Sequence, residues 1–247
     1  MNTVHTPSYE MRIAAVGVSR QATERELLED AIALDGKSII ELGCGRAELT
    51  RHVAQGVDRR VLALEVDEIQ HAHNAARTDL PNVEFRLAGA EAIPAADASF
   101  DVALMFKSLH HVPVPEMGNA LREIGRVLRP GGLLFVSEPV FAGAFNEILR
   151  LFHDEQRVRT AAFDALRAAV AEGLFELVDE IFFDAPYVFA DFGEFERRII
   201  GVTHTVHRLT PEVHAEVARR FAAHCGPQGA RFASPMRADL LRRPVAR

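Results

Sequence analysis

Short apolar runs alternate with amphipathic segments along much of this 247-residue chain. Five of these runs have the length and composition of buried strands, and they lie at residues 38–42, 60–65, 83–87, 100–106 and 133–137. Helical spacing of apolar residues is found between them, at residues 47–54, 68–78 and 117–128. Strands that alternate with helices pair in parallel through right-handed crossovers. The alternation therefore predicts a Rossmann-like, doubly wound α/β fold.

The alternation loosens in the C-terminal part of the chain. Residues 143–172 have a broken helical pattern, and further strands are predicted at 174–183 and 232–241. These strands complete a mainly parallel, seven-stranded sheet. Residues 184–229 are predicted to form a helical insert before the last strand. An insert of this length is typical of a substrate lid, although it is also compatible with a packing elaboration.

The pattern divides the chain into three parts. Residues 1–35 are expected to form an N-terminal cap and the first helix, which is amphipathic at 21–34. Residues 36–140 form the predicted core, and residues 141–247 complete the sheet and carry the insert. We expect the chain to act as a monomer or a homodimer.

The composition argues against several kinds of partner. A net charge of −7 does not suit a protein that grips phosphate backbones, so we expect no nucleic-acid partner. No stretch of sequence reaches the roughly 20 apolar residues of a membrane-spanning helix, so we expect no membrane partner. Cys44 and Cys225 are too few for a disulfide framework, which favours a reducing, cytoplasmic location.

A glycine-rich turn follows the first predicted strand, in the segment ELGCG at 41–45. Glycines let the backbone approach a ligand closely and adopt positive φ. Glu65 ends the second predicted strand, where a carboxylate can accept hydrogen bonds from both hydroxyls of a ribose. The third glycine of a dinucleotide fingerprint is absent, because AEL stands at 47–49, so a pyrophosphate ligand is disfavoured. A tight turn without a ligand is the alternative interpretation.

The chain resembles the class I S-adenosylmethionine-dependent methyltransferases through four successive segments. They are ELGCGRAELT, VLALEVDEIQ, FRLAGAEAIPAADASFDVALMFKSLHHV and ALREIGRVLRPGGLLFVSEP, which together span about residues 36–140. Each segment is weak alone, but all four occur in the family's order and at its spacing. The resemblance implies that S-adenosylmethionine is the cofactor and that a small molecule is the substrate.

The resemblance also implies which residues contact the cofactor. They are Glu41, Gly43 and Gly45 around the methionine part, Glu65 at the ribose with Val66 beside it, Ala90 and Glu91 beside the adenine, and Lys107 facing the sulfonium and the substrate. One position departs from the family, since many relatives have Asp where this chain has Gly89. The polar contact to the adenine amino group must then come from Glu91, the backbone or water.

Three residues near the carboxyl ends of predicted strands are candidates for catalysis. His110 and His111 follow the fourth strand and Glu138 follows the fifth, and ligands of doubly wound sheets bind outside these strand ends. If the acceptor is a hydroxyl or an acidic carbon, a histidine or carboxylate must remove a proton. A structural role for the histidine pair is the alternative.

Further residues are candidates for substrate binding: Tyr9, Tyr187, His204, His207 and Arg237. An aromatic face stabilises a sulfonium by cation–π attraction, and an arginine can clamp a carboxylate. His204 and His207 have the spacing of a metal pair, but a third ligand at matching spacing is not evident, so we expect no metal site.

The sequence thus predicts an enzyme that transfers a methyl group in line from S-adenosylmethionine to a small molecule. One alternative keeps the cofactor but attacks its γ-carbon, releasing methylthioadenosine. A non-catalytic cofactor-binding protein is a second alternative, and a nicotinamide-dependent oxidoreductase is a third.

Overall fold

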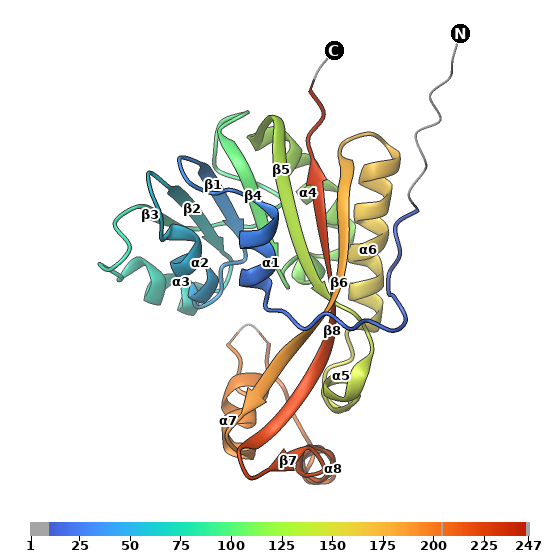
Figure 1. Cartoon of the computed structure of the whole chain (residues 1–247). Coiled ribbons are helices and arrows are strands. Elements are labelled where there is room, and N and C mark those ends of the chain that lie inside the picture. Colours follow the sequence, from blue (N-terminus) through green and yellow to red (C-terminus); the bar gives the residue numbers. More distant parts are fainter. Residues whose placement is uncertain (1–9, 204, 246–247) are drawn as a thin grey trace.

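The structure is a computed structural model that describes residues 10–203 and 205–245 (Figure 1). One mixed sheet runs through it in the order β3-β2-β1-β4-β5-β8-β6, with β7 paired to β8. Its strands are β1 (Ser38–Leu42), β2 (Arg60–Glu65), β3 (Val83–Leu87), β4 (Phe100–Phe106), β5 (Leu128–Pro139), β6 (Glu176–Phe189), β7 (Cys225–Gly226) and β8 (Gly229–Arg242). Strands β1 to β5 pair in parallel, whereas β8 runs antiparallel between β5 and β6. The predicted doubly wound, mainly parallel α/β fold is confirmed.

Helices cover both faces of the sheet. The α-helices are α1 (Glu24–Ala31), α2 (Glu48–Ala54), α3 (Glu68–Ala75), α4 (Met117–Val127), α5 (Gly143–Leu149), α6 (Gln156–Ala171), α7 (Phe192–Phe195) and α8 (Pro211–Ala222). Shorter turns are the 3-10 helices η1 (Leu109–His111) and η2 (Val114–Glu116) and the π-helix η3 (Glu196–Ile200). Within the described residues, no helix combines the length and the apolar character needed to cross a membrane.

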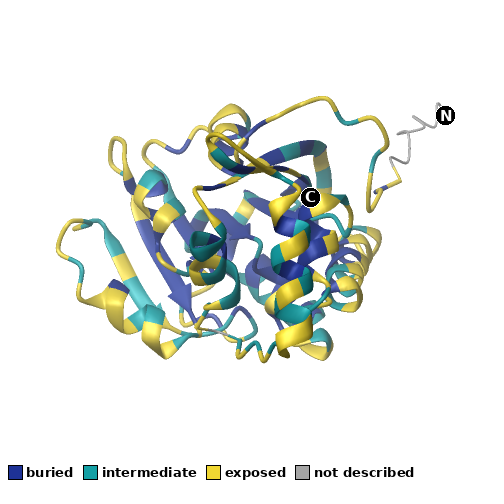
Figure 2. Cartoon of the chain, turned by 90° about the horizontal axis from the view of Figure 1, so that it is seen from below, coloured by how far each residue is buried: buried dark blue, intermediate teal, exposed yellow. Residues whose placement is uncertain are grey.

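Two apolar clusters make up the core on the two sides of the sheet. Because side chains alternate along a strand, Ile40 of β1 packs in one cluster with α4 and α6, and Ile39 packs in the other with α1 and α2. Figure 2 shows the buried strands in dark blue, with the outward faces of the helices exposed. This packing fixes the carboxyl ends of β1, β2, β4 and β5 at one edge.

The last two long strands differ from the prediction. Strand β6 continues to Phe189 and β8 begins at Gly229, so the insert between them covers 190–228 rather than 184–229. The described insert includes α7, η3, α8 and β7. Pro186 is tolerated inside β6 because β6 is the edge strand of the sheet, where a missing N–H breaks no ladder.

The far ends of β6 and β8 extend into a second lobe that also contains α5, α7 and α8 (Figure 1). An aromatic cluster fills this lobe, with Phe145, Phe189, Phe195, Phe221 and Phe232 all buried. Its rings meet at centroid distances of 5.2 to 6.2 Å, the range of favourable edge and offset contacts. The second lobe therefore has a packed aromatic core around the far ends of β6 and β8.

The described part of the predicted N-terminal cap lies along β6. The backbone N–H of Arg12 donates to Glu180 at 2.7 Å, and Ala22 N–H donates to the carbonyl of Asp184 at 3.2 Å. Helix α1 follows, and it carries Glu24 to the end of β4, where Lys107 binds it. The N-terminal element that reaches the predicted site is thus α1.

Candidate functional site

The glycine turn after β1 has the strained backbone that its sequence predicts. Gly43 and Gly45 have φ of +76° and +52°, in the left-handed region that residues with a Cβ rarely adopt. A Cβ on Gly43 would lie 2.7 Å from the Cβ of Ser108, which follows β4. A Cβ on Gly45 would meet nothing within 4 Å, so the space above this residue is open. The turn therefore packs against β4 at Gly43 and leaves room at Gly45.

Glu65 joins the turn to the end of β2. Its Oε2 accepts a hydrogen bond from Gly45 N–H at 2.6 Å, and its Oε1 accepts from Val66 and Asp67 at 2.8 and 2.9 Å. Glu65 is buried, whereas the Val66 side chain is exposed. The sequence analysis missed Asn74 of α3, whose side chain donates to Gly45 O at 2.7 Å and which no pattern singles out. The predicted pairing of glycine turn and acid is present in space.

A group of carboxylates lies under the turn. Glu41 is 2% exposed, and burial, with repulsion from Glu24 and Glu65, raises its pKa to about 7. Among the described residues, Glu41 Oε2 and Glu24 Oε1 are buried without a hydrogen-bond partner. Unpaired buried acceptors are costly, so this corner is suited to a ligand that donates hydrogen bonds or carries positive charge.

Lys107 stands at the end of β4 with φ of +53°. Its ammonium forms an ion pair with Glu24 of α1. Burial opposes the charge, but Glu24, Tyr187 and Glu138 together raise the pKa of Lys107. The sequence analysis missed Glu24, because only the fold brings α1 to this strand end. The ion pair neutralises the charge of Lys107 at this end of β4.

Glu91 takes the space of the missing side chain at position 89. A Cβ built on Gly89 would overlap both carboxylate oxygens of Glu91. Asn119 of α4 holds the backbone of Glu91, donating to its carbonyl at 3.0 Å, and the neighbouring Ala90 is buried. The Glu91 carboxylate thus lies against the backbone of Gly89, in space that a side chain at position 89 would need.

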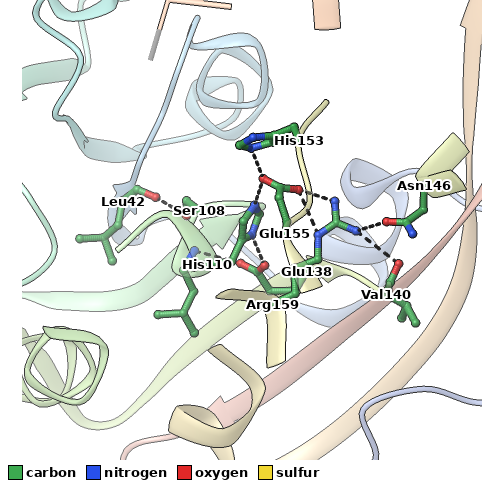
Figure 3. A network of polar contacts seen from close by, with 10 residues as sticks. Leu42, Ser108, His110, Glu138, Val140, Asn146, His153, Glu155 and Arg159 are labelled. Carbon is green, nitrogen blue, oxygen red and sulfur yellow. Dashed lines mark hydrogen bonds and ion pairs between the residues drawn. The ribbon is translucent and has the colours of Figure 1, made fainter. Parts of the chain in front are cut away.

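A buried polar network surrounds His110 (Figure 3). His110 is 4% exposed, and its Nδ1 is hydrogen-bonded to Glu138 Oε2. The other carboxylate oxygen of Glu138 accepts from Leu109 N–H at 2.9 Å. Burial alone would lower the pKa of His110, but Glu138 and Glu155 raise it to about 9. The predicted residues His110 and Glu138 therefore lie together, with the imidazole held as a cation.

Glu155, just before α6, is the residue of this network that the sequence analysis missed. Its Oε1 lies 3.5 Å from His110 Nε2 and 2.9 Å from His153 Nε2. Its Oε2 accepts from Arg159, with the shorter contact at 2.5 Å to Nη2. Glu155 lies more than 40 positions from His110 in the chain, so no local spacing indicates the contact.

The third predicted catalytic residue, His111, and the predicted substrate-binding residues fall into different surroundings. His111 is exposed, and its ring lies 4.1 Å from that of His110. Tyr187 stacks on Phe145 at 4.8 Å, and His207 meets the edge of the His153 ring at 4.7 Å. Tyr9 and His204 lie outside the described residues.

Arg237 requires a correction. It is 3% exposed in the interior strand β8, where its Nε donates to Asp239 at 2.8 Å and its guanidinium covers the ring of Phe163 at 4.6 Å. A buried and paired guanidinium has no face for a substrate carboxylate. The predicted clamp therefore does not describe it, because β8 lies between β5 and β6 in the interior of the sheet.

A hollow of about 1540 Å³ lies at the opposite edge of the sheet. Ser38, Arg60 and Val83, which begin β1, β2 and β3, line it. Ligands of this fold bind outside the carboxyl ends of the strands. We therefore assign the candidate site to the edge that carries the glycine turn.

Comparison with known proteins identifies the family. A family model described as a methyltransferase domain matches residues 39–132. O-methyltransferase rstn1 of Aspergillus nomiae is 30% identical over 171 residues, which cover 66% of this chain and 75% of the relative. The chain is a class I S-adenosylmethionine-dependent methyltransferase. It is thus a transferase, and S-adenosylmethionine is its cofactor.

Other relatives match this methyltransferase over shorter stretches. The 27-O-demethylrifamycin SV methyltransferase of Amycolatopsis mediterranei is 35% identical over 107 residues, covering 42% of this chain and 39% of the relative. The crystal structure of a putative methyltransferase from Bacillus halodurans has a TM-score of 0.65 at 19% identity, covering 91% of this chain and all of the other. That likeness shows that the two share a fold.

Proposed function

We propose that this methyltransferase transfers the methyl group of S-adenosylmethionine to a hydroxyl oxygen of a small molecule. Two of the relatives, an O-methyltransferase and a 27-O-demethylrifamycin SV methyltransferase, have names that support oxygen as the acceptor atom. The net charge of −7 favours a small molecule over nucleic acid. The observation that carries the proposal is the turn at Gly45, which is open above and has unpaired carboxylate oxygens below.

The residues around this turn fit the parts of the cofactor. The unpaired oxygens of Glu41 and Glu24 are suited to the ammonium of its methionine end. Glu65 is suited to accept from a ribose hydroxyl at Oε2, which accepts one hydrogen bond in the structure, from Gly45 N–H, and keeps a second lone pair. Glu91 replaces the acid that many relatives have at position 89 and is suited to accept from the adenine amino group. Lys107, paired with Glu24, adds no net positive charge beside the sulfonium.

Bound S-adenosylmethionine supplies an electrophilic methyl group. The acceptor oxygen forms the new C–O bond as the S–CH₃ bond breaks, the electron pair of the broken bond stays on sulfur, and the hydroxyl proton is released. The task of the protein is to align the acceptor with the methyl group and to exclude water.

His110 and Glu138 act in this proposal as positioning residues. Both ring nitrogens of His110 face carboxylates, so the imidazole holds its proton and is not available to take another. The pair fixes η1, from which the neighbouring His111 projects to the exposed side where an acceptor can approach. Tyr187 and His207 belong to elements of the second lobe and are the candidates to contact the acceptor.

Incubation of the purified chain with S-adenosylmethionine and a panel of hydroxylated small molecules tests the proposal. We expect S-adenosylhomocysteine together with an acceptor product one methylene heavier, both detected by mass spectrometry. Reactions without acceptor serve as the control. Methylthioadenosine formed from the cofactor alone would instead establish the alternative chemistry at the γ-carbon and contradict methyl transfer.

A further inference from the structure

Three side chains from two distant parts of the chain lie close together near the glycine turn that follows β1. His110 and His111 come from η1, and Glu155 precedes α6. One ligand atom of each, a ring nitrogen or a carboxylate oxygen, lies within 4.8 Å of those of the other two. The sequence analysis expected no metal site, because it considered only the spacing of His204 and His207. The fold assembles a different set.

The distances within this set approach those around a bound ion. His110 Nε2 lies 3.5 Å from Glu155 Oε1, and ligand atoms of a tetrahedral zinc site lie about 3.4 Å apart. His153 Nε2 lies 2.9 Å from the same carboxylate oxygen. A ligand atom of the exposed His111 lies within 4.8 Å of those of His110 and Glu155. Glu155 Oε1 is therefore the point on which the histidines converge.

Outer residues hold two of these ligands in the orientation that a metal site requires. Metal-binding histidines commonly donate their second ring N–H to a carboxylate, and Glu138 stands at Nδ1 of His110. Glu138 is itself fixed by Leu109 N–H at 2.9 Å. Arg159 binds only Oε2 of Glu155, at 2.5 and 3.1 Å, which leaves Oε1 directed at the histidines (Figure 3). His110 Nε2 and Glu155 Oε1 thus face each other, while the second polar atom of each side chain is held by Glu138 and Arg159.

The group is also accessible from solvent. His111 is exposed and the His153 side chain is 28% exposed, whereas His110 and Glu155 are buried behind them. An ion can thus approach from outside and retain open coordination positions on that side. Imidazole nitrogens with one carboxylate suit Zn²⁺, Co²⁺, Ni²⁺ and other divalent transition metals better than Ca²⁺.

We propose that His110, His111 and Glu155 bind a divalent transition-metal ion, with His153 as a further ligand. The ion would take the place of the proton on Nε2 of His110, which is released, while the N–H at Nδ1 stays hydrogen-bonded to Glu138. The site lies close to the glycine turn that follows β1. Helix η1 begins next to Ser108, and Ser108 Oγ donates to the carbonyl of Leu42, the last residue of β1, at 2.7 Å. An open position on the ion would bind the acceptor hydroxyl and make it easier to deprotonate. This last step rests on the proposed methyl transfer to oxygen, whereas the binding of the ion does not.

Titration calorimetry with Zn²⁺ tests the site. The sample is the full chain, without an affinity tag, from which a chelator has first removed any metal. We expect one ion per chain, with Glu138→Gln lowering the affinity about 10- to 100-fold, as the loss of an outer partner does elsewhere. His111→Ala, which removes an exposed ligand and spares the fold, should lower it at least as much. His214→Ala is the matched control, because His214 pairs with Glu196 on the surface at 2.6 Å and should bind Zn²⁺ as the wild type does.

A spectroscopic measurement gives a second readout. Replacement of Zn²⁺ by Co²⁺ should produce visible absorption bands in the wild type and in His214→Ala, and these bands should be lost in His111→Ala. Absence of binding at equimolar ion, or equal affinity in His111→Ala and the wild type, would overturn the proposal and leave a network of ion pairs. S-adenosylhomocysteine binding measured on the same samples separates this failure from a failure of the proposed function.

Discussion

Glu24, Glu41 and Glu65 lie around the turn that follows β1, and each is held differently. Glu65 accepts three backbone hydrogen bonds, Glu24 binds Lys107, and Glu41 has an oxygen without a partner among the described residues. A buried carboxylate without a partner is unfavourable unless a ligand provides one. At the scale of single residues, the site is therefore arranged for a nucleoside that carries a cationic amino group.

Replacing Glu65 by Ala tests its proposed grip on the ribose. Loss of the hydrogen bonding between Glu65 and the ribose, and of the hold that Glu65 has on the turn, should raise the dissociation constant of S-adenosylhomocysteine about 10- to 100-fold, at 1.4 kcal/mol for each factor of ten. Calorimetry measures this constant, and circular dichroism checks the fold. Glu68→Ala, at an exposed acid three positions further, is the control and should bind normally. An unchanged constant in a folded Glu65 variant would show that the ribose lies elsewhere.

Glu41 should make stability depend on pH. Its pKa is about 7 in the folded chain, against its usual 4.5. Between these values the folded state keeps a proton that the unfolded state has lost, so the free energy of unfolding falls as the pH rises. Glu41→Gln lacks this effect, and its stability relative to the wild type should increase by up to about 3 kcal/mol from pH 4.5 to pH 7. Urea denaturation across this range measures the difference, and a constant difference would contradict the raised pKa.

Among the secondary-structure elements, helix α1 affects the site directly, because it carries Glu24, which binds Lys107. Thr23 caps the helix in a capping box, accepting from Glu26 N–H at 3.2 Å. Thr23→Ala should cost about 1 kcal/mol of stability. It should also weaken S-adenosylhomocysteine binding, since a frayed first turn loosens the ion pair of Glu24 with Lys107.

Thr210→Ala is the matched control for this prediction. The Thr210 hydroxyl also caps its helix, accepting from Val213 N–H at 3.3 Å but without a capping box, and α8 belongs to the second lobe. Denaturation should give a similar loss of stability, whereas calorimetry should give wild-type affinity for S-adenosylhomocysteine. Equal weakening of ligand binding in the two variants would argue against a local role for α1.

The sequence predicts some of the secondary-structure elements better than others. Strands β1 to β4 agree with the predicted strands to the residue. For β1, β2 and β4 the reason is that both faces of the parallel sheet are buried there and the apolar pattern is nearly continuous, whereas β3 is an edge strand whose residues are partly buried or exposed. The end of β6 was missed, since Pro186 suggests an ending that an edge strand does not need. Glu24, Asn74 and Glu155 were missed because their partners lie on other elements. Contacts of that kind arise from the fold and leave no local spacing.

The whole molecule joins a core, which contains the stretch that the family model matches, to a second lobe around the far ends of β6 and β8. The family model ends at residue 132, and the second lobe is formed by later residues that pack around Phe145 and Phe189. The insert was expected from its length and helical pattern, but its packing on extended strands was not. Its function as a substrate lid stays a prediction, as do the roles of Tyr187 and His207 in binding the acceptor.

A crystal structure of the chain with bound S-adenosylhomocysteine tests the central claim most directly. We expect the methionine end of the ligand over Gly43 and Gly45 with its ammonium on Glu41. The ribose hydroxyls should be within hydrogen-bond distance of Glu65, and the adenine should lie beside Ala90 and Glu91. A ligand at another edge of the sheet, or a turn at 43–45 that remains empty at saturating ligand, would contradict the account.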